Sequence, residues 1–261
     1  MKCILFGNCQ CSGVKKFLEF SPFFSMYEVH QFANWEMIQQ EQHFPIQLLK
    51  EADLVIYQPL SDIHGCYSTD RAHPNSFFHL LKPDCKTISF PRIHNNAIFP
   101  LFHKKFQTPF MYGYVNNKYS SLEELLHLYD TDQLDFDFDS RMKKNYEFAL
   151  QRDINCDVKI ANFIYNNISN HKMFLTHDHP TSIVFDEVTR QICNLLKIQY
   201  TSVPVDENIT GLQDSVYSTI SCQYPISRYS IRHFHLEYIQ KETPEANTFY
   251  RNNLIHFYQM R

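Results

Sequence analysis

Short apolar runs alternate with helical stretches over the first hundred residues, and this alternation strongly constrains the fold. Three runs have the size and composition of buried strands: Lys2–Phe6, Asp53–Tyr57 and Lys86–Phe90. Helical patterns occupy Val14–Phe20, Pro45–Glu51 and Pro74–Leu81. Strands that alternate with helices predict an α/β fold in which a small parallel sheet is flanked by many helices.

The pattern becomes helical in the middle third of the chain. Ser120 and Ser121 with Glu123 and Glu124 resemble a capping box, and apolar residues then recur at helical spacing in 141–151 and 158–168. A late strand is predicted at 172–176 and a helix at 182–196, followed by proline-punctuated loops with short helices, one of them near 231–239. We therefore predict one domain over 1–261. It comprises an α/β half (1–115), a helical insertion (116–170), and the last strand with C-terminal helices (171–261).

The composition excludes several classes of protein. Only 5 glycines are present, and the sequence has no GxGxxG or GxxxxGK[ST] motif. The main sequence signatures of a dinucleotide-binding site and of a P-loop are therefore absent. A formal charge of −4 does not indicate the broad basic surface that is typical of proteins that bind nucleic acid. The 8 cysteines are scattered without a CxxC pair, which favours a reduced, cytoplasmic protein without structural zinc. No apolar run approaches the ~18–20 residues that span a bilayer, so no transmembrane segment is expected.

The turn after the first strand is a candidate catalytic site. Gly7–Gln10 lies where the strand hands over to a helix, and it carries Cys9. The N–H groups of a helix start can lower the pKa of a thiol and can bind an oxyanion. The alternative is a structural role, because cysteines are common in cores and such turns often need glycine.

Polar residues follow each predicted strand. They are Asn8, Cys9 and Gln10 after the first strand, Gln58 after the second, Arg92, His94 and Asn95 after the third, and His177 and His179 after the late strand. If these strand ends meet at one edge of the sheet, the residues supply a nucleophile, amide donors and a general base. Pro180 restricts the backbone of His179 and so fixes its position. Only His177 and His179 could share an ion, and without an evident third ligand we expect no metal.

Basic groups elsewhere could contact phosphates. Ser68 and Arg71 lie in a string that offers hydroxyls and a guanidinium, although such strings more often cap helices. Lys104 belongs to one compact basic group, and Arg141 and Lys144 belong to another. Such groups are usually solvated surfaces, but a nucleotide 3′-phosphate would need one of them.

Several short motifs follow one another along the chain in an order that resembles the WcbI-type polysaccharide biosynthesis family. They are GNCQ at 7–10, DLVIYQPL at 53–60, Ser68-Thr69, FPRIH at 90–94, HPT at 179–181 and YPIS at 224–227. The resemblance runs from Met1 to about Tyr238. It implies a cytoplasmic protein of capsule or surface-polysaccharide assembly that binds coenzyme A and O-acetylates a sugar. The sheet is also distantly similar to that of SGNH-type hydrolases, with a flavodoxin-like core, and on that analogy Cys9 is the nucleophile and His179 the base.

The leading hypothesis is therefore an acyl-CoA-dependent O-acetyltransferase whose partners are coenzyme A and a sugar or polysaccharide precursor. Its substrate or oxyanion contacts are expected at Gly7, Asn8, Gln10, Gln58, Ser68 and His94, and its coenzyme contacts at Arg71, Arg92, Lys104, Arg141 and Lys144. Two alternatives stay open, an acyl ester or thioester hydrolase and a non-catalytic protein that binds coenzyme A or a glycan. Homo-oligomerisation also stays open.

Overall fold

A four-stranded parallel sheet forms the centre of the N-terminal half. The computed structural model describes residues 1–101, 119–202 and 223–259. The strands are β1 (Lys2–Gly7), β2 (Glu28–Ala33), β3 (Leu54–Tyr57) and β4 (Lys86–Ser89), in the order β2-β1-β3-β4. All three predicted strands are present, so the α/β prediction is confirmed. This order is the flavodoxin-like one, in which the chain reverses direction across the sheet between β1 and β3.

The edge strand β2 was not predicted from the sequence. It pairs in parallel with β1 from Lys2↔Glu28 to Gly7↔Ala33. Every residue of β2 keeps some exposure, whereas β1 is almost fully buried. An edge strand can therefore carry His30 and Gln31, and it lacks the apolar run by which the buried strands were recognised.

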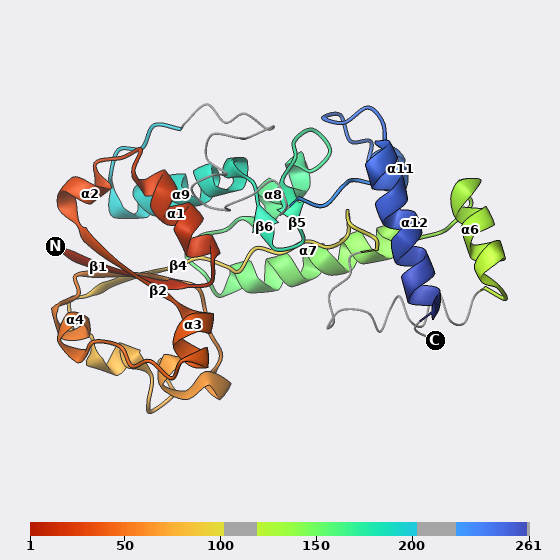
Figure 1. Ribbon diagram of the computed structural model, residues 1–261. Helices are drawn as coiled ribbons and strands as arrows, with labels where there is room; N and C mark the ends of the chain where they lie inside the picture. Colours follow the sequence, from red (N-terminus) through yellow and green to blue (C-terminus); the bar gives the residue numbers. More distant parts are fainter. Residues whose placement is uncertain (102–118, 203–222, 260–261) are drawn as a thin grey trace.

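Helices cover both faces of the sheet (Figure 1). Cys3 and Leu5 point to the face packed against α1 (Gln10–Leu18) and α9 (Ser182–Leu196). Ile4 and Phe6 point to the other face, which α3 (Asn34–Gln39) and α4 (Ile46–Glu51) cover with aliphatic side chains. The 3₁₀ turns η1 (Asp62–Tyr67) and η2 (Phe77–Leu80) add aromatic side chains to the same face. Because both faces of the sheet are covered, β1 is apolar after Lys2, and β3 is apolar from Leu54 to Tyr57.

Two predicted helices have different bounds in the structure. Helix α1 begins at Gln10 rather than Val14, because Asn8 Oδ1 accepts the N–H of Gln10 at 2.9 Å and starts the helix directly after β1. The helix predicted at 74–81 is only the single turn η2. Pro83 disfavours helical backbone at the residue before it, which prevents extension of that turn.

Helix α2 (Phe23–Met26) lies beside β2, and the remaining helices lie beyond the sheet (Figure 1). They are α6 (Leu122–Asp130), α7 (Phe138–Ile154), α8 (Ala161–Asn167), α11 (Arg228–His233) and α12 (Pro244–Gln259). Ser121 caps α6 as predicted, since its side chain accepts the N–H of Glu124. The prediction of only short helices after residue 200 is wrong, because Pro244 opens the 16-residue α12 rather than a loop. None of the helices within the described ranges is long and apolar enough to cross a membrane.

The late strand does not join the parallel sheet. Strand β5 (Phe174–Thr176) forms a separate antiparallel pair with β6 (His179–Pro180), in the register Thr176↔His179. The pair is closed by a turn at His177 and Asp178. We had expected the late strand to contribute to the same sheet edge as the others, so this expectation is corrected.

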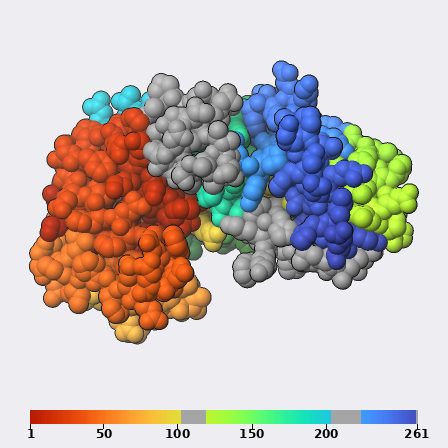
Figure 2. All heavy atoms as spheres, viewed as in Figure 1, coloured from red at the N-terminus to blue at the C-terminus, as the bar shows by residue number. Residues whose placement is uncertain are grey.

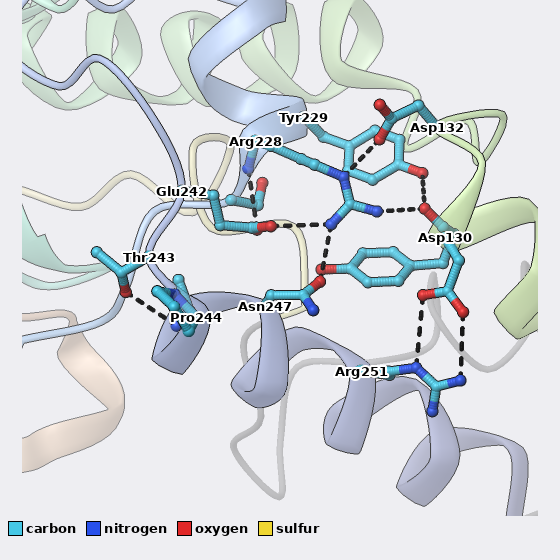
Figure 3. Close-up of polar contacts among 12 residues, drawn as sticks. Asp130, Asp132, Arg228, Tyr229, Glu242, Thr243, Pro244, Asn247 and Arg251 are labelled. Atoms are coloured by element: carbon cyan, nitrogen blue, oxygen red, sulfur yellow. Dashed lines mark hydrogen bonds and ion pairs between the residues drawn. The ribbon is translucent and has the colours of Figure 1, made fainter.

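An arginine hub joins the helices at the C-terminal end of the fold (Figure 3). Arg228 of α11 donates to Asp132 after α6, to the carboxylate of Glu242 at 2.8 Å and to Asn247 Oδ1 of α12 at 2.8 Å. Its guanidinium also stacks 4.3 Å from the ring centroid of Tyr129. Figure 2 shows these helices at the opposite end of the molecule from the N-terminal half, and α7 extends from one to the other (Figure 1).

Candidate active site at the strand ends

The carboxyl end of β1 is built around two amide side chains and a glycine. A Cβ atom at Gly7 would lie 2.7 Å from Cys11 Sγ and 2.8 Å from Gln58 Oε1, so only glycine fits. Gln58, which follows β3, accepts the N–H of Asn8 at 2.9 Å and donates to the carbonyl of Pro91 at 3.4 Å. The ends of β1, β3 and β4 therefore meet, as predicted, at the switch point where open α/β sheets bind ligands.

Gln10 links this edge to the β5–β6 turn. Its buried amide donates to the carbonyl of Ile93 at 2.7 Å and to that of Asp178 at 2.9 Å. Its Oε1 accepts the N–H of Ile93 at 3.0 Å and the amide of Gln58 at 2.9 Å. The side chain thus uses both of its donors within the chain, and its role in this structure is to hold the loops in place.

The first turn of α1 differs from the expected oxyanion site. Its N–H groups bond within the chain: that of Gln10 to Asn8 Oδ1, that of Cys11 to the Asn8 carbonyl and that of Ser12 to the Cys9 carbonyl. The expectation of free N–H groups at this helix start is therefore wrong. Asn8 Nδ2, for which the described residues provide no hydrogen bond, is the amide donor that remains for a ligand.

Cys9 and Cys11 lie in contrasting environments. The side chain of Cys9 is exposed at the start of α1, whereas that of Cys11 is buried beside Gly7. Burial, with the neighbouring Cys9 second, raises the pKa of the Cys11 thiol well above its usual range. Of these two thiols, only Cys9 is placed to meet a ligand.

Two imidazoles, those of His94 and His177, meet on the segments that Gln10 links to this thiol-bearing turn. The rings of His94 and His177 meet edge to face at 5.2 Å, and Asn95 donates its N–H to the His177 carbonyl at 2.7 Å. His177 is buried, and its Nε2 lies 3.3 Å from Asp178 Oδ2. His179 follows in β6. The rings of His94 and His177 are therefore brought together, although β5 lies outside the parallel sheet.

Two guanidinium groups flank His94. Burial, followed by the charges of His177, Arg152 and Arg92, lowers the pKa of His94 to about 4. Burial and then Arg92 also lower the pKa of Arg152. Neither arginine pairs with a carboxylate within the described ranges. An anion bound here would relieve the repulsion between the two cations.

Arg152 is a site residue that the sequence reasoning missed. It lies at the end of α7, 60 residues from Arg92, and donates to the Arg92 carbonyl at 3.4 Å. Tyr165 of α8 was missed too, although its hydroxyl accepts the amide of Asn95 at 3.1 Å. Neither follows a predicted strand, and no local motif marks a residue that long-range packing brings to the site.

Arg71 lies beside β4, whereas Ser68 is bonded to Ser76 at the start of η2. Ser68 is fully buried, and its hydroxyl accepts the N–H of Asp70 at 3.0 Å. Arg71 stacks 4.6 Å from the ring centroid of Phe78 and donates to Thr87 within β4. No contact within the described ranges joins either residue to the Cys9 turn.

The two predicted coenzyme contacts of the second basic group, Arg141 and Lys144, lie in different environments. Arg141 donates to the carbonyls of Pro100 at 3.0 Å and Asn96 at 3.3 Å, and burial lowers its pKa to about 10. Arg141 thus braces the loop after β4. Lys144 is exposed on α7, and Lys104 lies outside the described residues.

The low pKa of His94 predicts an acid-dependent loss of stability. The unfolded chain, with a histidine pKa near 6.5, binds the proton at higher pH than the folded chain, whose His94 titrates near 4. His94 therefore contributes stability above pH 6.5 that is lost as the pH falls to about 4, at most about 3 kcal/mol. Urea unfolding from pH 7 to pH 4.5 should show a smaller loss for His94→Asn than for the wild type. Equal slopes for the two proteins would contradict a buried, neutral His94.

Comparison with known proteins places the chain in a family. The family model described as polysaccharide biosynthesis enzyme WcbI matches residues 2–201. The chain belongs to the WcbI family. The match spans every strand-end residue described above and ends before α11 and α12. No curated protein matches the chain at a significant level.

The fold of a WcbI enzyme extends over the whole chain. A solved structure of WcbI, described as a novel polysaccharide biosynthesis enzyme, matches with a TM-score of 0.71 and 17% identity, covering 100% of this chain and 90% of the other. It is described as native protein without a disulfide bond between coenzyme A and one of its cysteines. At this identity the likeness shows the WcbI fold, including the C-terminal helices that the family model does not match.

Proposed function

We propose that this protein is a coenzyme A-binding O-acyltransferase that moves an acetyl group to a sugar hydroxyl during polysaccharide biosynthesis. Membership of a family described as polysaccharide biosynthesis enzymes supports the pathway class. The description of the WcbI structure, which names coenzyme A and a cysteine together, supports the coenzyme. A capsule or other surface polysaccharide as product and a cytoplasmic location belong to the same proposal.

The observation that carries the proposal is the pair of guanidinium groups of Arg92 and Arg152, for which the described residues provide no carboxylate partner. Arg92 precedes Ile93, which is hydrogen-bonded to Gln10 of the Cys9 turn. Coenzyme A presents a diphosphate, a 3′-phosphate and a terminal thiol. Two guanidinium groups without a carboxylate partner suit a diphosphate, since the planar fork of arginine matches phosphate oxygens. The bond between Gln10 and Ile93 places Cys9 and Arg92 on segments that are joined directly.

The chemistry has two versions at this site. In the first, the Cys9 thiolate attacks the thioester carbonyl, coenzyme A leaves as its thiol, and the sugar hydroxyl then takes the acetyl group from Cys9. In the second, the hydroxyl attacks acetyl-CoA directly. The base would be His179, because the pKa of His94, lowered to about 4, makes that imidazole a weak base at pH 7. Asn8 Nδ2 would donate to the oxyanion.

A Cys9→Ala variant distinguishes the two versions. In the covalent version, the wild type incubated with acetyl-CoA gains one acetyl group at Cys9, seen by mass spectrometry of the intact protein, and Cys9→Ala loses at least about 10³-fold in transfer rate. Cys11→Ala is the matched control, because its buried thiol should not be acylated. An active Cys9→Ala enzyme would exclude the covalent version. Acetyl-CoA hydrolysis at an equal rate with and without a sugar would favour the hydrolase alternative.

A further inference from the structure

A cavity lies beside the imidazoles, between the segment before β5 and α12. Its volume is about 710 Å³, within the range of small-molecule sites. Three segments line the cavity. Lys172 precedes β5, Tyr224 and Ile226 precede α11, Tyr238 and Thr243 precede α12, and Phe249 lies in α12. Three of these six side chains are aromatic.

The ammonium group of Lys172 lies in the wall of this cavity. Lys172 Nζ donates to Gln223 Oε1 at 3.0 Å, which leaves further donor capacity on the ammonium. Burial lowers the pKa of Lys172, and in the described part of the chain no carboxylate pairs with it. Glu245 is the acidic residue of the wall, but it is exposed and its carboxylate is engaged by its own N–H and by Thr243. An ammonium that is partly withdrawn from water and has no carboxylate partner among the described residues favours an anionic ligand.

The aromatic wall joins the cavity to the candidate active site. The ring of Tyr224 lies 6.2 Å from that of Phe249 and 6.3 Å from that of His177, nearly parallel to both. The N–H of Tyr224 donates to the Leu175 carbonyl at 2.8 Å, so this segment runs beside β5. A ligand that packs against Tyr224 would therefore be separated from the imidazole of His177 by the Tyr224 ring alone.

The Arg228 hub holds the walls of the cavity. Arg228 immediately follows the segment that contains Tyr224 and Ile226, and it binds Glu242, which leads into Thr243 and α12 (Figure 3). Tyr250 of α12 donates to the Pro225 carbonyl at 2.7 Å. These bonds fix the Tyr224 segment against α12, so the cavity is formed before a ligand enters.

We propose that this cavity binds an anionic sugar, with the carboxylate or phosphate on Lys172 and the sugar ring against Tyr224 and Phe249. The inference rests on the proposed function, because it assigns the sugar acceptor to this cavity and makes that acceptor acidic. The aromatic rings match the apolar face of a pyranose, and the ammonium matches the charge.

The test compares sugars that differ only in charge. Ligand-observed NMR titration at millimolar concentration uses glucuronate, glucose 6-phosphate and glucose. We expect at least one anionic sugar to bind at least about 10-fold more tightly than glucose, as a charge-assisted hydrogen bond implies. Lys172→Met should remove that preference, and Lys172→Arg should retain most of it. Lys50→Met, at an exposed lysine of α4, is the matched control and should change nothing.

The outcomes separate this inference from the proposed function. Equal binding of charged and neutral sugars, no binding of any of them, or an unchanged preference in Lys172→Met would overturn the inference. Coenzyme A binding is measured on the same variants, and Lys172→Met should leave it unchanged. If coenzyme A fails to bind while the charge preference holds, the proposed transfer fails but the anionic sugar site stands.

Discussion

Gln10→Leu should lower the free energy of unfolding by roughly 3–6 kcal/mol and abolish ligand binding at the strand ends. Leucine has a similar volume but leaves both polar groups of the Ile93 backbone and the Asp178 carbonyl without their partner. Each buried group left unsatisfied costs about 1–3 kcal/mol. Because Gln10 joins three segments, the loop after β4 and the β5–β6 turn should also separate from the Cys9 turn.

Urea unfolding of the purified variant measures the first part of this expectation. Gln39→Leu is the matched control, because Gln39 is exposed at the end of α3 and should change stability by less than about 0.5 kcal/mol. A loss below about 1 kcal/mol for Gln10→Leu would show that these hydrogen bonds are replaced by water or by other partners. The role assigned to Gln10 would then be wrong.

Arg228→Met should cost about 3–5 kcal/mol, a loss comparable to that of Gln10→Leu. The side chain of Glu242 is only 8% exposed and relies on Arg228 for its ion pair. Removing one partner of a buried pair leaves an uncompensated charge, which accounts for this magnitude. The stacking of the guanidinium on Tyr129 and Tyr229 is lost as well.

Arg232→Met provides the matched control for this hub. Arg232 also pairs with Asp132, at 3.0 Å, but its side chain is 55% exposed, so its removal should cost less than about 1 kcal/mol. Adding Glu242→Gln to Arg228→Met should recover part of the lost stability, because it removes the stranded charge. If the two arginine variants were equally stable, or the double variant were no better than Arg228→Met, the hub would not hold these helices as described.

The parts of the fold that are apolar and local could be predicted from the sequence. Strands β1, β3 and β4 are short buried runs, and α9 was predicted with its observed bounds because its apolar residues recur regularly over 15 residues. The edge strand β2 could not be recognised, since solvent on one side permits polar residues. The start of α12 was misread because proline both ends and begins helices.

The candidate site shows the same division. Residues that follow a buried strand, such as Asn8, Gln58 and His94, could be found because topology brings strand ends together. Sequence spacing cannot show that the amide of Gln10 makes all its hydrogen bonds to other groups of the chain. It also cannot show that Arg152, at the end of α7, lies beside Arg92. The division of the chain at 1–115, 116–170 and 171–261 stays a prediction.

Binding of coenzyme A at the Cys9 edge of the sheet is the central claim, and calorimetric titration tests it most directly. Coenzyme A and acetyl-CoA are titrated into the wild type and into Arg92→Met, whose exposed side chain can be replaced without loss of fold. We predict a one-to-one complex with the wild type and at least about 10-fold weaker binding for Arg92→Met, because a charge-assisted contact to phosphate is lost. The absence of binding of both ligands to the folded wild type, or equal affinities for the two proteins, would contradict the account.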